Sequence, residues 1–185
     1  HSSKAFDSIS HNQLLVELQK IGCSCHVVHW FSDYLANREQ RVVTCEGPTA
    51  WKAVQRGVPQ GSCLSPLLFN IFVRELPRNT SSNSLQFADD VSISEASHSL
   101  DEIKEKLVAG FDGIKEFCYN KGLSLNANKT QFLVMKSAHK RLSDPMTITI
   151  DDVNIPASAS VCLLGVTLDR RLTFAEHVQN VVTKC

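Results

Sequence analysis

The stretch from residue 84 to residue 94, SLQFADDVSIS, places two adjacent aspartates, Asp89 and Asp90, inside an alternating apolar pattern typical of β-strands. The apolar residues on either side of the pair are Leu85, Phe87, Val91 and Ile93. A regular strand would direct the two carboxylates to opposite faces, and burying one of them unpaired would cost several kcal/mol, roughly. We therefore expect a tight turn at the pair, from which both carboxylates reach the same open side while Phe87 and Val91 stay packed.

The two carboxylates also need an electrostatic explanation. Two such charges about 4 Å apart repel by roughly 4 kcal/mol at an effective dielectric constant of about 20. A divalent cation removes this cost, because Mg²⁺ takes carboxylate oxygens as ligands and keeps coordination positions for phosphate. On these residues alone, the pair indicates either a metal site or an ordinary Asp-Asp turn between surface strands.

Helix signals recur along the chain. Capping residues and the helical spacing of apolar residues predict helices that start at Ser10, near Val27, at Ser65, at Ser99 and at Thr173. Ser10 with Gln13 and Ser99 with Glu102 form capping boxes. The helix after Ser99 should run for about four turns. Ser65 should be an N-cap followed by a proline at the first helical position, and Glu176 should cap the last helix.

Strand-like segments lie between these helices, at residues 40–45, 51–57, 131–135, 146–150 and 161–168. The first two flank the sequence Glu46-Gly47-Pro48 and predict a hairpin. We see no repeat and no linker that would separate two domains. The pattern predicts an α+β fold, with an antiparallel sheet backed by helices on one side.

Composition limits the partners and the compartment. The chain has 19 basic and 19 acidic residues, so nucleic acid would have to be bound by local patches. The candidates are Lys129, Lys136, Lys140 and Arg141, and the pair Arg170 and Arg171, although both groups also fit a solvated surface. The seven scattered cysteines suggest free thiols, and we expect an intracellular protein of the cytoplasm and nucleus, not a secreted one. No apolar run approaches the roughly 18 residues of a membrane span.

A second motif lies at residues 56–72, RGVPQGSCLSPLLFNIF. Gly57 and Gly61 flank Pro59 and Gln60 immediately before a predicted helix. Glycines let a ligand approach the main chain closely, and a glutamine side chain can hydrogen-bond to it. The same residues would also suit a turn that merely precedes a helix. Upstream, SKAFDSISH (3–11) places Phe6 just before a helix start.

Taken together, SKAFD with His11, RGVPQGSCLSPLLFNIF and FADD, in this order and spacing, resemble the reverse transcriptase of jockey-like non-LTR retrotransposons (LINE type). The stretches GLSLNANKTQFLVM (122–135) and LLGVTLDRRLTFAEHV (163–178) resemble the continuation of that domain. The resemblance covers essentially the whole chain. It implies that residues 1–185 form a polymerase palm with part of the fingers, truncated on the N-terminal fingers side and before the thumb.

The resemblance implies an RNA-directed DNA polymerase, which transfers deoxynucleotides from dNTPs to the 3′-hydroxyl of a DNA primer on an RNA template. Asp89 and Asp90 match the aspartates that hold two Mg²⁺ ions, or Mn²⁺ in their place. Lys129 matches a lysine on the pyrophosphate side that can protonate the leaving group. These are the metal and catalytic residues that the family pattern assigns to this chain.

The family pattern also assigns nucleotide contacts. Gln60 and Gly61, in the Pro-Gln-Gly loop, match positions that lie against the incoming nucleotide. Phe6 matches the bulky position that excludes a ribose 2′-hydroxyl and so favours deoxynucleotides. Lys4 and Asp7 belong to the same motif, and we expect them to form a salt-bridged or helix-entry pair without binding metal.

One position departs from the family pattern. The family has an aspartate, its third metal carboxylate, three residues before the lysine of KAFD, and this chain has His1 there. Imidazole is a poor ligand for Mg²⁺ beside two carboxylates. Two functions are therefore open, an active polymerase domain and a catalytically inactive, decayed or nucleic-acid-binding remnant of one. A group-II-intron maturase would share the palm, but FADD with GLSLNANKT and LGVTLD is more typical of mobile-element proteins.

Overall fold

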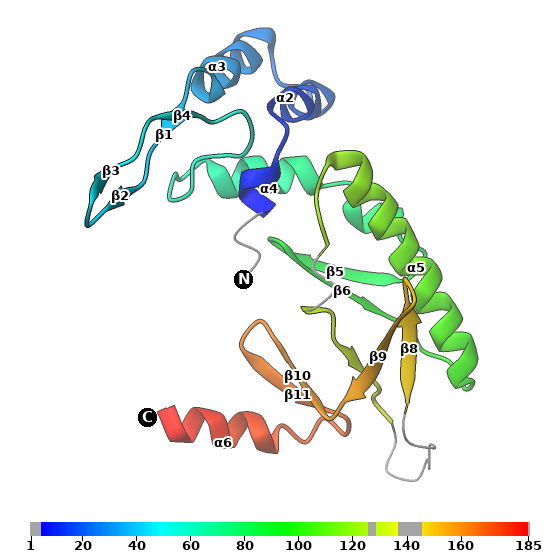
Figure 1. Cartoon of the computed structure of the whole chain (residues 1–185). Coiled ribbons are helices and arrows are strands. Elements are labelled where there is room, and N and C mark those ends of the chain that lie inside the picture. The colour runs from blue at the N-terminus through cyan, green and yellow to red at the C-terminus, as the bar shows by residue number, and fades with distance from the viewer. Residues whose placement is uncertain (1–4, 126–128, 137–145, 185) are drawn as a thin grey trace. The chain divides into compact units, whose positions relative to one another are not determined.

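The computed structural model describes residues 5–125, 129–136 and 146–184. The chain folds as two compact units, His1–Leu125 and Asn126–Cys185, and each is described by itself (Figure 1). The boundary falls in the stretch GLSLNANKT, whose composition is not that of a flexible linker, so the sequence gives no sign of it. Both units contain strands and helices, which confirms a mixed α and β fold. Within the described ranges, no helix has the length and apolar character needed to cross a lipid bilayer.

The helices of the first unit confirm most of the predicted starts. They are α1 (Ala5–Ser8), α2 (His11–Lys20), α3 (Cys25–Leu35), α4 (Ser65–Val73), the 3₁₀ helix η1 (Leu76–Asn79) and α5 (Leu100–Lys121). The Ser10 hydroxyl accepts a hydrogen bond from the Gln13 backbone N–H at 3.5 Å, and the Ser99 hydroxyl accepts one from Glu102 at 3.4 Å. Both predicted N-caps are therefore present, and α5 is longer than predicted, at 22 residues.

The start of α4 differs from the prediction by one residue. Leu64 occupies the N-cap position, and Ser65 is already the first residue of the helix. The Ser65 hydroxyl does not cap the helix because it donates a hydrogen bond to the Pro59 carbonyl instead. Ser65, which we predicted as the N-cap, therefore connects α4 to the preceding loop through its side chain.

The core of the first unit forms where α2, α3, α4 and α5 bring their apolar faces together. Its most deeply buried side chains are Ile9, Leu14, Leu18, Leu35, Leu68, Phe72 and Val73. Phe6, Val91 and Ile93 are partly buried and pack against the same core. The three sequence motifs are therefore anchored on one set of apolar residues.

The strands of the first unit pair locally. They are β1 (Glu39–Gln40), β2 (Val43–Thr44), β3 (Gly47–Pro48), β4 (Lys52–Ala53), β5 (Asn83–Phe87) and β6 (Asp90–Ser94). The predicted hairpin is confirmed, but its turn is at Cys45 and Glu46, because Thr44 is paired with Gly47. Our prediction of one antiparallel sheet was too simple, since the described strands form small separate sheets.

The second unit is built from β7 (Phe132–Leu133), β8 (Thr147–Ile150), β9 (Val153–Ser158), β10 (Ser160–Leu163), β11 (Val166–Asp169) and α6 (Ala175–Lys184). Strand β9 lies between β7 and β8, parallel to β7 and antiparallel to β8. The single strand that we predicted for 161–168 is wrong. Leu164 and Gly165 both have positive φ, +48° and +84°, and form the turn of a β10–β11 hairpin.

Asp169 organises the entry to α6, a role that we had given to Glu176. Its carboxylate accepts hydrogen bonds from the backbone of Arg171 at 2.9 Å and of Phe174 at 2.8 Å, and from the Thr173 hydroxyl at 2.9 Å. Desolvation alone would raise the pKa of this carboxyl, but these donors outweigh it and lower the pKa to about 2. The loop before α6 is therefore closed around a carboxylate, and the helix begins at Ala175 instead of Thr173.

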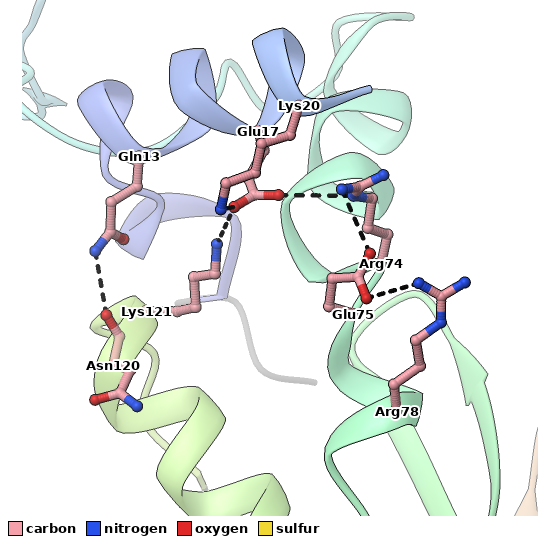
Figure 2. Close-up of polar contacts among 8 residues, drawn as sticks. All are labelled: Gln13, Glu17, Lys20, Arg74, Glu75, Arg78, Asn120 and Lys121. Atoms are coloured by element: carbon pink, nitrogen blue, oxygen red, sulfur yellow. Dashed lines mark hydrogen bonds and ion pairs between the residues drawn. The ribbon is translucent and has the colours of Figure 1, made fainter. Parts of the chain in front are cut away.

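A buried carboxylate joins three elements of the first unit. Glu17, on α2, is only 3% exposed. It accepts hydrogen bonds from Lys121, at the end of α5, at 2.8 Å and from Lys20 at 2.9 Å, and the Arg74 Nε, just after α4, lies 3.6 Å away (Figure 2). Burial would raise the pKa of Glu17, but the hydrogen bonds from the two lysines lower it below the usual 4.5.

We expect Glu17→Gln to lower the free energy of unfolding at neutral pH by about 3 kcal/mol, since it leaves the largely buried Lys121 ammonium without its charged partner. Because the folded-state pKa is lowered, the contribution of Glu17 is complete above pH 4.5 and is lost as the pH falls through the folded-state value. Urea unfolding should show the wild type and the variant converging in acid. Glu102→Gln, which breaks the exposed pair with Lys106, is the matched control and should cost much less. Equal losses from the two variants would contradict this role for Glu17.

Candidate functional site

The aspartate pair lies at a two-residue turn between β5 and β6. Phe87 is paired with Asp90, so Ala88 and Asp89 form the turn and Asp90 begins β6. Ala88 has a φ of +51°, a left-handed conformation that is uncommon outside glycine, asparagine and aspartate. Asp89 is half-buried and Asp90 is exposed. The predicted tight turn is confirmed. Because Asp89 lies in the turn and Asp90 begins β6, the two aspartates are not consecutive residues of one regular strand.

The two faces of this hairpin differ sharply. Val91 and Ile93 pack against the core, as expected. Phe87 does not, contrary to our prediction, because the register places it opposite Asp90 on the face that points away from the core. Leu85 is on the same face. Leu85 is 74% exposed and Phe87 is 65% exposed. Asp90 therefore shares an open face with two large apolar side chains.

The Pro-Gln-Gly loop forms a second compact turn. The Ser62 N–H donates to the Pro59 carbonyl at 3.2 Å, and Gly61 has a φ of +83°. A type II turn requires positive φ at this third position, which glycine supplies without strain. Gln60, at the second position, is exposed, and its amide donates to the Asp7 carboxylate at 3.0 Å. The glycine has open space where a Cβ would lie, so the main chain there is accessible.

Helix α1 and Ile9, which follows it, pack directly on this loop. The Val58 N–H donates to the Phe6 carbonyl at 2.9 Å, and the Gly57 N–H donates to the Ile9 carbonyl at 2.8 Å. A Cβ on Gly57 would lie 2.7 Å from the Asp7 Cα, so only glycine allows this approach. The His11 imidazole closes the contact through the Gly57 carbonyl at 2.8 Å.

Phe6 is held by an aromatic contact. Its ring stacks on Phe69 of α4, with the centroids 4.6 Å apart and an interplanar angle of 23°. The side chain is half-buried, so part of the ring faces solvent. The structure thus brings Phe6, Gln60 and Gly61 into one assembly, built from the two motifs that are far apart in sequence.

Other predicted residues have different outcomes. Lys129 is exposed and belongs to the second unit. His1 and Lys4 lie outside the described residues, so the expected pairing of Lys4 with Asp7 stays a prediction. Asp7 does have a polar partner, Gln60, which we did not anticipate. Nothing in the sequence indicates the contact between Asp7 and Gln60. His11, which contacts the Gly57 carbonyl, is in contrast part of the SKAFDSISH motif.

The carboxylates of Asp89 and Asp90 are the residues that could hold a metal ion at this turn. Within the described ranges, no group of three or more histidine, cysteine, aspartate and glutamate residues is placed to bind one. Mg²⁺ is commonly bound by one or two carboxylates, with waters and substrate phosphates completing its octahedron. Two carboxylates at one turn, of which Asp90 is exposed and Asp89 half-buried, suit that requirement by the chemistry of their oxygen donors.

Comparison with known proteins identifies the family. The family model for reverse transcriptase (RNA-dependent DNA polymerase) matches residues 2–168. The RNA-directed DNA polymerase from mobile element jockey of Drosophila funebris is 26% identical over 96% of this chain and 20% of its own length. The R2DM retrotransposable-element Pol polyprotein of Drosophila melanogaster is 32% identical over 75% of this chain and 14% of its own length.

A third relative, the probable RNA-directed DNA polymerase from transposon X-element of Drosophila melanogaster, is 27% identical over 98% of this chain. The chain spans about a fifth of the length of the jockey relative. These relatives come from non-LTR retrotransposons, in agreement with the motifs. Members of the family generally use divalent metal ions. This chain belongs to the reverse transcriptase (RNA-dependent DNA polymerase) family.

Proposed function

We propose that this chain supplies the metal-binding and nucleotide-binding part of an RNA-directed DNA polymerase, which extends a DNA primer on an RNA template with dNTPs. The observation that carries the proposal is the β5–β6 turn, which presents Asp89 and Asp90 beside an exposed face. The palm and partial-fingers assignment for residues 1–185 is part of the same proposal.

Asp89 and Asp90 would hold the divalent ions, with Mg²⁺ as the expected metal and Mn²⁺ as a substitute. When bound, two such ions lower the pKa of the primer 3′-hydroxyl and neutralise charge on the transferred phosphoryl group. The two carboxylates provide the fixed negative charge that concentrates cations at the turn. Their anchoring through Val91 and Ile93 keeps that charge in a defined position.

The assembly of α1 and the Pro-Gln-Gly loop would bind the nucleotide. Gln60 is oriented by the Asp7 carboxylate, and the open main chain at Gly61 allows a sugar or phosphate to approach closely. Phe6 is fixed against Phe69, so a ligand that carries an extra hydroxyl toward the ring cannot push it aside without breaking the stack. This rigidity supports a role for Phe6 in excluding ribonucleotides.

Lys129 is proposed as the proton donor to the pyrophosphate leaving group. Its support is the family match of NANKT and its exposure to solvent. A lysine at such a position stabilises the developing negative charge on the leaving oxygen as well as supplying a proton.

A second function is favoured by one observation, the histidine at position 1. If His1 leaves the metal set one carboxylate short, the chain would be an inactive, decayed or nucleic-acid-binding relative. The test is primer extension by a chimera in which this chain replaces the matching segment of the jockey polymerase of Drosophila funebris. Extension that depends on Mg²⁺, dNTPs and an RNA template supports polymerase function. Absence of extension in the chimera both with His1 and with aspartate at that position would contradict it.

A further inference from the structure

One exposed surface of the first unit lies outside all the motifs quoted above. It is formed by α3 and the β1–β4 ribbon, and it carries a column of three stacked side chains, Trp30, Tyr34 and Arg38. The Trp30 and Tyr34 rings are 5.5 Å apart between centroids with an interplanar angle of 8°, and the Arg38 guanidinium lies 5.9 Å from the Tyr34 centroid. The Trp30 side chain is 54% exposed.

Two positive charges lie on the same side of the ribbon. Gln40 is paired with Lys52, and the Val54 N–H donates to the Arg38 carbonyl, so Arg38 and Lys52 are diagonal neighbours on one face. Among the residues that the structure describes, neither cation has an ion-pair partner, unlike Lys20, Lys106 and Lys121. Uncompensated positive charge therefore lies beside stacked aromatic rings.

The column is continuous with the nucleotide-binding assembly. The Tyr34 hydroxyl is hydrogen-bonded to the Ser62 hydroxyl at 2.8 Å. Ser62 closes the turn that carries Gln60 and Gly61. The Tyr34 side chain of the column therefore contacts the residue that closes the turn.

We propose that the aromatic column, Trp30, Tyr34 and Arg38 together with Lys52, binds a single-stranded segment of nucleic acid that leads to the Gln60 turn. A base would stack on Trp30, and phosphates would pair with Arg38 and Lys52. Aromatic platforms beside unpaired cations are the general means by which proteins bind single strands, and a duplex hides the base faces that such a platform needs. The proposal rests on the proposed function only for the role of this strand in polymerisation.

The chain contains a matched control in the same ribbon, a second exposed tryptophan with an arginine of its own. Arg41 directly follows Gln40 and Trp51 directly precedes Lys52, just beyond the last pair of the β1–β4 ladder. The Arg41 guanidinium covers one face of the Trp51 ring at 4.5 Å from its centroid. Trp51 is 57% exposed, close to the exposure of Trp30, but it has no contact with the Gln60 turn among the described interactions.

The experiment measures the binding of a fluorescent single-stranded RNA 12-mer to the whole 185-residue chain, without Mg²⁺ and without dNTP. Trp30→Ala should raise Kd roughly 5- to 150-fold, and Trp30→Phe should retain most of the affinity. Arg38→Gln and Lys52→Gln should each reduce the slope of log affinity against log salt by about 0.7. Trp51→Ala should change Kd by less than about twofold. DNA of the same sequence should bind with similar affinity, because neither contact uses the 2′-hydroxyl.

Several results would overturn the proposal. These are no RNA binding by the wild type, equal weakening by Trp51→Ala and Trp30→Ala, tighter binding of duplex than of single strand, and an unchanged salt slope in Arg38→Gln. A Trp30→Ala variant that alters self-association without altering RNA affinity would indicate a protein surface instead. Melting temperatures check that each variant is folded. Because no catalysis is measured, an inactive polymerase would leave these binding results unchanged, which separates this proposal from the proposed function.

Discussion

In the jockey chimera with aspartate at position 1, Asp89→Asn should reduce primer extension by about a thousandfold or more and should leave the fold equally stable or slightly more stable. Removing an anionic metal ligand takes away several kcal/mol of transition-state stabilisation, and each 1.4 kcal/mol or so is worth about tenfold in rate. Without metal, the same change relieves repulsion between adjacent carboxylates, and asparagine is well tolerated in tight turns. Stability and activity should therefore move in opposite directions.

The chain provides its own control for this variant. Asp151 and Asp152 form another adjacent aspartate pair at a hairpin turn, between β8 and β9, and both are exposed. Asp151→Asn and Asp152→Asn should leave extension unchanged. Thermal melting in chelator and extension on an RNA template are measured for all three variants. An Asp89→Asn protein that melts several degrees lower and loses activity only in proportion would show that the pair serves the fold.

The second large effect concerns His1. Changing His1→Asp in the same chimera should raise the rate of extension by roughly a hundredfold or more, because it restores the third carboxylate that the family pattern places there. Imidazole is a poor ligand for Mg²⁺, whereas it binds softer divalent metals well.

Single-turnover extension with saturating dNTP isolates this step from template binding. The gain should be largest with Mg²⁺, and Asp89→Asn should abolish it. Equal rates for the chimeras with histidine and with aspartate would show that position 1 does not contribute to the metal set. His1→Asn is the matched control, since it removes the imidazole without adding charge, and it should give no comparable gain.

Local signals in the sequence predicted the elements whose stability is local. Ser10 and Ser99 cap α2 and α5 because an N-cap depends on the side chain and on the next three residues. The turn at the aspartate pair was predictable because a regular strand would have buried a charge. The hairpin between residues 40 and 57 followed from its turn residues, although its turn lies at Cys45 and Glu46.

Features that depend on which other part of the chain a segment pairs with or contacts were not predictable from the sequence. Phe87 was expected in the core because its neighbours alternate, but the register with Asp90 decides which face it occupies. The β10–β11 hairpin was missed because a single Gly165 in an apolar run does not separate a turn from a continuous strand. Asp169 caps the loop before α6 through backbone donors that lie two to five residues later, and a carboxylate at that distance carries no standard capping signature.

The site residues stay predictions. Motif resemblance proposes Asp89, Asp90, Gln60, Gly61 and Phe6, and the structure shows how the last three are assembled, through Gly57 and the stack on Phe69. The Asp7–Gln60 hydrogen bond joins residues 53 positions apart, so no local pattern in the sequence indicates it. The role of Lys129 stays a prediction.

The central claim is that Asp89 and Asp90 form a metal site and not an ordinary turn. The most direct measurement is NMR of the 185-residue chain during titration with Mn²⁺, whose paramagnetism broadens nearby amide signals. Mn²⁺ binds carboxylate oxygens as Mg²⁺ does. We predict that signals of residues 87–91 broaden first, and at lower Mn²⁺ when a dNTP is present, because its phosphates complete the coordination shell. Equal broadening at the Asp151–Asp152 turn, with no effect of the dNTP on either turn, would contradict the claim.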